Sequence, residues 1–70
     1  MRITYPDEFF ARSARAILSA CGVAAVMTLN VLEAGAVGPR RVCRIEVADA
    51  DGVEAVAVLT RFKLMGATAA

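Results

Sequence analysis

Two adjacent carboxylates, Asp7 and Glu8, follow Pro6 near the amino end of the 70-residue sequence. Proline is favoured in the first turn of a helix, where its missing N–H costs no hydrogen bond. A carboxylate there could act as a general base or a nucleophile, so both are candidate catalytic residues. Alternatively, both complement the positive end of the helix dipole, and Glu8 pairs with Arg12 one turn later.

A second group of charges, Arg40, Arg41 and Arg44, forms a local positive cluster. The planar fork of an arginine matches the oxygens of a phosphate group. These three residues are therefore candidates for binding a phosphorylated ligand. The alternative is a solvated loop followed by the outward face of a strand.

The sequence contains no histidine, and its two cysteines, Cys21 and Cys43, are far apart. This composition excludes a zinc cage and any catalysis that needs imidazole. We expect both cysteines to be buried, reduced thiols in a cytoplasmic protein. No metal site and no cofactor are predicted.

The composition argues for a folded protein with more apolar surface than one copy can hide. Hydrophobic residues make up 59% of the sequence, and the net charge is +1. A nucleic-acid-binding domain usually concentrates positive charge, so none is expected. A chain of this size buries only about 60% of its unfolded surface. We therefore predict a homo-oligomer, a dimer or larger, or assembly with a complementary subunit.

Residues 16–32 carry no charge, but we do not expect them to cross a membrane. Seventeen residues are at the short limit for a span. The segment also divides into two periodicities. Residues 6–21 follow a helical period, and Gly22 is a natural stop. The polar helix face carries Glu8, Arg12, Arg15 and Ser19, and the apolar face carries Phe10, Ala14, Ile17, Leu18 and Cys21.

The rest of the sequence favours strands. Residues 2–5 are predicted as a short strand and 24–33 as one strand or two short ones, after which Gly35, Gly38 and Pro39 break the chain. Alternation over 43–47 and 56–64, around a turn at 49–52, predicts a hairpin. The tail, 66–70, is expected to fray.

These elements give an α+β fold with one helix on an antiparallel sheet, in the order β-α-β-β-β, as a single domain over 1–70. One alternative stays open for 51–65. Asp51 and Glu54 could form a capping box, and Gly66 could end a helix. The β-branched residues of this segment favour the strand.

Two stretches resemble hotdog-fold thioesterases of the hydroxybenzoyl-CoA type, over the helix and the last three strands only. The first is Phe9-Phe10-Ala11-Arg12, followed by Leu18 and Gly22, with Tyr5 upstream. The second runs over 32–64 and matches at Gly38, Arg40, Arg41, Asp49, Asp51, Gly52 and Phe62. The resemblance implies a protein that binds or hydrolyses acyl-CoA, either active or an incomplete form that is inactive alone. In it, Asp7 or Glu8 would supply the catalytic carboxylate, and Arg40, Arg41 and Arg44 would bind coenzyme A phosphates.

The segment 2–23 also resembles the opening strand and helix of ACT domains, whose element order is βαββαβ. That resemblance implies a regulatory module that binds a small ligand and senses amino acids. It requires 51–65 to be helical and the last strand of that fold to be missing. A third alternative is a non-catalytic assembly protein that uses its apolar surface to coat a partner.

Overall fold

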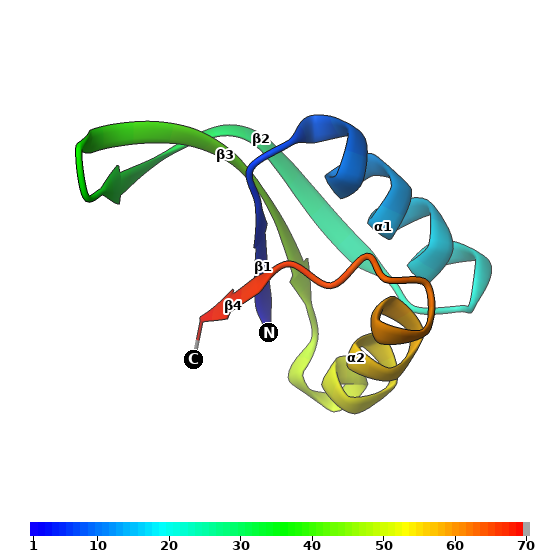
Figure 1. The fold of residues 1–70 in the computed structure, drawn as a ribbon. Helices are drawn as coiled ribbons and strands as arrows, with labels where there is room; N and C mark the ends of the chain where they lie inside the picture. Colours follow the sequence, from blue (N-terminus) through cyan, green and yellow to red (C-terminus); the bar gives the residue numbers. More distant parts are fainter. Residues whose placement is uncertain (70) are drawn as a thin grey trace.

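Four antiparallel strands form one sheet, and two helices cover one of its faces (Figure 1). The structure is a computed structural model, and it describes residues 1–69. The sheet order is β2-β3-β1-β4, which confirms the predicted α+β class. The strands are β1 (Arg2–Tyr5), β2 (Ala25–Gly35), β3 (Gly38–Val47) and β4 (Ala67–Ala69). The helices are α1 (Glu8–Ala20) and α2 (Gly52–Arg61), with a 3-10 turn, η1 (Asp49–Asp51), before α2.

Helix α1 confirms the prediction for 6–21, and both of its ends follow from single residues. Asp7 is the N-cap, and its side chain accepts a hydrogen bond from the Phe9 N–H at 2.6 Å. Gly22 has a φ of 80°, a left-handed conformation that glycine adopts without strain. There the Val23 N–H donates to the Leu18 carbonyl at 2.8 Å. The helix is therefore closed at both ends by local hydrogen bonds.

Strands β2 and β3 form one long hairpin rather than two elements separated by a broken loop. Gly35 pairs with Gly38, so the expected break is a tight turn inside a continuous ladder. The register shifts between Thr28 and Val31, where Asn30 has a φ of 56°. This bulge bends the hairpin, and its far end projects beyond the helices (Figure 1). We call residues 31–42 the arm.

The predicted strand over 56–64 is wrong, because residues 52–61 form helix α2. The predicted pairing of 43–47 with this segment is therefore also wrong. Strand β3 pairs instead with β2 on one side and β1 on the other. The observed order is β-α-β-β-α-β, which is the element order of the second resemblance. The expectation that its last strand is missing is wrong, because residues 67–69 form β4.

Packing explains why α2 forms in spite of its β-branched residues. Ala55, Val58 and Leu59 lie at i, i+3 and i+4 and are buried, whereas Val53 and Val56 face outward. One helical face thus enters the core beside α1, and this tertiary burial outweighs the weak local preference for strand. Asp51 makes no side-chain capping bond, so the capping box is not what starts the helix.

The segment after α2 returns across the molecule to complete the sheet. Residues 67–69 pair with β1 as β4, so that part of the tail is a strand rather than a frayed end, and residue 70 lies outside the described residues. The Tyr5 hydroxyl donates to the Leu64 carbonyl at 2.6 Å and fixes the start of this return.

Within residues 1–69, neither helix has the length and apolar character needed to cross a bilayer.

The core lies between the helices and the covered face of the sheet. The largest fully buried side chains of this core are Ile3 in β1, Leu18 in α1, Val23 directly after Gly22, Ile45 in β3 and Leu59 in α2.

Candidate functional site

A hollow with a mainly polar lining lies where β1 passes into α1. Its volume is about 150 Å³. Glu8 supplies a carboxylate, Asn30 an amide and Arg41 a guanidinium, so the hollow carries both signs of charge beside a neutral donor and acceptor. Its lining residues are Pro6, Glu8, Asn30, Arg41, Val42 and Cys43. We call this the junction hollow.

The two candidate carboxylates have different surroundings. Asp7 is engaged by the Phe9 N–H as the N-cap of α1. Glu8 lies in the first turn and accepts from the Arg12 Nε at 2.7 Å, which confirms the predicted pair. Since the junction hollow is lined by Glu8 and not by Asp7, Glu8 is the carboxylate placed to meet a ligand there. A catalytic role for either residue stays a prediction.

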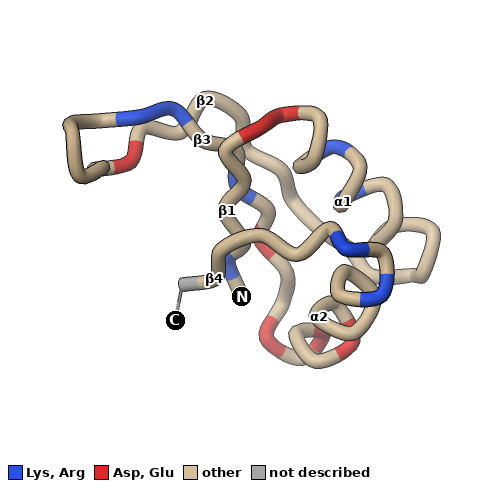
Figure 2. Tube along the Cα trace, viewed as in Figure 1, with Lys and Arg blue, Asp and Glu red and all other residues tan. Residues whose placement is uncertain are grey.

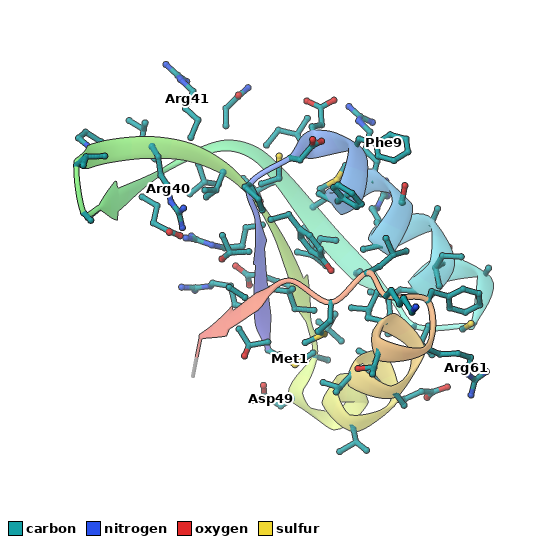
Figure 3. All side chains as sticks on the ribbon, in the orientation of Figure 1. Met1, Phe9, Arg40, Arg41, Asp49 and Arg61 are labelled. Carbon is teal, nitrogen blue, oxygen red and sulfur yellow. The ribbon has the colours of Figure 1, made fainter. Side chains whose placement is uncertain are left out.

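The structure divides the arginine cluster between two faces of the hairpin. Glu33 accepts from the Arg40 Nη2 at 2.8 Å, and the Arg44 Nη2 lies 3.7 Å from the same carboxylate. Arg41 is next to Arg40 in the chain, but successive side chains of a strand point to opposite faces. Figure 3 shows Arg40 and Arg41 leaving the arm in opposite directions. Only Arg41 reaches the junction hollow.

The bulge in β2 explains how Glu33 comes to neutralise two arginines. Because Val31 pairs with Val42 three residues after Thr28 pairs with Arg44, β2 holds one extra residue there. That residue reverses which β2 side chains face which side beyond the bulge. Glu33 thereby joins Arg40 and Arg44 on one face, and the Nε of Arg44 is buried there without a hydrogen-bond partner. Figure 2 shows a basic segment and an acidic one on the two strands of the arm.

A second hollow adjoins the first across Pro6, which lines both. Its volume is about 220 Å³ and its walls are mainly apolar. Burial raises the pKa of Tyr5, one of its lining residues, against a smaller lowering by the Gly66 backbone. Lys63 contributes a single cation at this hollow. The lining is Tyr5, Pro6, Phe10, Lys63, Leu64, Met65 and Gly66, and we call it the apolar hollow.

The cysteines follow the prediction only in part. Cys43 is buried on β3 and lines the junction hollow, as expected for an apolar strand position. Cys21 is exposed, because it is the C-cap of α1 and the buried stripe of that helix is Ala11, Ala14 and Leu18. Both are free thiols. Within residues 1–69, no group of acidic and cysteine side chains could hold a metal ion.

Asn30 and Pro6 are the site residues that the sequence did not single out. Asn30 reaches the hollow only because a bulge turns the backbone of β2 to positive φ, which asparagine tolerates better than most residues. An asparagine inside an alternating strand is the one available signal of such a bulge. Comparison of the chain with protein-family models, with curated proteins and with solved structures found no match.

Proposed function

We propose that the protein is a non-catalytic, ACT-like module that binds a small zwitterionic ligand of the amino-acid type in the junction hollow. The observation that carries the proposal is the meeting of Glu8, Asn30 and Arg41 at one hollow of about 150 Å³. A carboxylate recognises an ammonium group, and a guanidinium recognises a carboxylate through paired hydrogen bonds. The element order β-α-β-β-α-β supports the same proposal.

The apolar hollow sets the expected side chain of the ligand. It shares Pro6 with the junction hollow, and Phe10, Met65 and Leu64 supply apolar walls. A ligand that places its charged groups between Glu8 and Arg41 can direct an apolar side chain past Pro6. Amino acids with aliphatic or aromatic side chains are therefore the expected ligands, and the cytoplasm is the expected location.

Nothing in the site favours the hydrolytic function over binding. Asp7 is engaged as a cap, and Arg40 and Arg44 lie beside Glu33 on the face of the arm opposite Arg41. The last strand of the thioesterase resemblance is also replaced by α2. Binding of acyl-CoA stays a prediction, and acyl-CoA belongs in the same binding test.

The direct test is a titration of the isotopically labelled protein with the common amino acids and short acyl-CoAs, followed by amide chemical shifts. We expect an apolar amino acid to shift amides around Glu8, Asn30 and Arg41, and to leave Glu46 on the opposite face unmoved. No shifts at millimolar ligand, or shifts centred on Arg40 and Arg44, would contradict the proposal.

A further inference from the structure

Strand β2 presents an unprotected edge. It is the outermost strand of the described sheet, and one of its two edges has no backbone partner among residues 1–69. Natural proteins protect such edges with lysine, proline or inward charges. Residues 25–35 contain no lysine and no proline, and Glu33 is their one charge. The bulge at Asn30 interrupts the edge, but Val31–Gly35 continues beyond it along the arm.

The same part of the molecule exposes apolar surface. Leu32 is 64% exposed, and Val37 at the turn is fully exposed. A hollow of about 280 Å³ lies at the arm, lined by Leu32, Glu33, Ala34, Gly35, Gly38 and Pro39. The whole molecule exposes 4607 Å². A compact monomer of 7.3 kDa is expected to expose about 4,200 Å². The projecting arm therefore carries surface that a compact single copy would not show.

We propose that a second copy of this chain pairs with the arm, strand β2 against strand β2 in antiparallel orientation, centred on Leu32. In a two-fold pair of this kind one residue always lies opposite its own copy. If that residue were Glu33, two carboxylates would oppose each other, which is destabilising. Centring on Leu32 places the two leucines side by side at the hollow of about 280 Å³ on the arm. Each Glu33 then lies opposite a Val31, with Arg40 of its own chain still beside it.

The proposed ladder between the two copies covers only a few residues, so the dimer is expected to be weak. The bulge at Asn30 limits the new ladder to residues around Val31–Gly35. Such a contact is smaller than the roughly 800 Å² per partner of a standard stable interface. We therefore expect a dimer that dissociates on dilution. The pairing needs no ligand in the junction hollow, so it can be tested independently of the proposed function.

Sedimentation equilibrium without ligand, over a range of concentrations, tests the association. The wild type is expected to shift from monomer to dimer, and Leu32→Lys to weaken the dimer about tenfold or more. Val53→Lys is the matched control, since Val53 is an exposed apolar residue on α2. A wild type that stays monomeric at every concentration, or a dimer that Val53→Lys disrupts and Leu32→Lys does not, would overturn the proposal.

Disulfide trapping tests the register. With the exposed Cys21 replaced by serine, Leu32→Cys is expected to form a covalent dimer under mild oxidation, because residues directly opposite have Cβ atoms about 5 Å apart. Ala34→Cys is the control, since residue 34 would then face residue 30 of the other copy. Stronger trapping at position 34 than at position 32 would overturn the Leu32-centred pairing. Circular dichroism checks that each variant keeps the fold.

Discussion

Glu8 and Arg41 line the same hollow although one begins α1 and the other lies in β3. They meet because β1 lies beside β3 and delivers the start of α1 to the base of the arm. The opposite charges share the hollow with Asn30, so it offers a carboxylate to an ammonium group and a guanidinium to a carboxylate group. The proposed function depends on this meeting.

Arg41→Gln is expected to weaken binding of an apolar amino acid by about ten- to a hundredfold, since a hydrogen bond to a charged group contributes roughly 1.5–3 kcal/mol. Arg40→Gln is the matched control, because Arg40 is adjacent in sequence but faces Glu33 on the other side of the arm. Calorimetric titration of both variants measures the difference. Equal losses for the two variants would count against the junction hollow as the binding site.

Both helices end with a residue in left-handed backbone, so introducing a glycine at one end and removing a glycine at the other should change stability in opposite directions. Lys63 follows α2 with a φ of 57°, and Gly22 follows α1 with a φ of 80°. In each case the next N–H donates back to the last turn at 2.8 Å. Lys63→Gly is expected to stabilise the protein by about 1 kcal/mol, since left-handed backbone costs a side-chain-bearing residue that much.

Gly22→Ala is the reverse change at the equivalent position. Space is not limiting, since a Cβ at Gly22 meets nothing within 4 Å. The variant is therefore expected to lose about 1 kcal/mol from backbone strain alone. Urea unfolding of both variants gives the two free energies. A loss on Lys63→Gly would contradict this account of the second helix end.

Tyr5 predicts a loss of stability at alkaline pH. Burial raises its pKa above the ordinary value of 10.0, so the folded state holds the phenol proton more tightly than the unfolded state. The stabilisation is complete below pH 10 and falls as the pH rises from the unfolded toward the folded pKa. Tyr5 is the single tyrosine, so tyrosinate absorbance follows it directly.

Tyr5→Phe separates this effect from other groups that titrate in the same range. The variant loses the hydrogen bond to the Leu64 carbonyl and is expected to be less stable by about 1–3 kcal/mol at neutral pH. Its stability should then fall less steeply than that of the wild type above pH 10. Parallel curves for the two proteins would show that Tyr5 does not carry the alkaline loss.

Leu59→Ala and Val53→Ala test the helix at 52–61. Leu59 is fully buried, and its truncation is expected to cost about 2–5 kcal/mol. Val53 is 87% exposed, and its truncation should change stability by no more than about 0.5 kcal/mol. Urea unfolding measures both. Similar losses at the two positions would contradict the observed helical face.

The first helix could be predicted from sequence because two kinds of signal agree over it. Its period is helical, and Pro6, Asp7 and Gly22 mark its ends with residues whose backbone chemistry is specific. The second helix could not, since Ala55, Val58 and Leu59 fit a helical face while Val56, Val58 and Thr60 fit a strand. Only the packing of the whole chain chooses between two periods that share the same residues.

The candidate site was predictable in residue type but not in grouping. Glu8 and Arg41 carry the charges that a ligand needs, and both stand out in the sequence. Their meeting depends on β3 lying between β2 and β1, whereas the predicted hairpin paired β3 with residues of α2. The separation of Arg41 from Arg40 and Arg44 follows from alternation along one strand, but the predicted strand began at residue 43, whereas β3 begins at Gly38.

The most direct test of the proposed function compares an apolar amino acid with its analogue lacking the amino group, against the wild type and Glu8→Gln. If Glu8 holds the ammonium group, Glu8→Gln weakens binding of the amino acid about tenfold or more and leaves the affinity for the analogue nearly unchanged. Equal affinities of the wild type for both compounds, or an equal loss for both on Glu8→Gln, would contradict recognition of a zwitterion in the junction hollow.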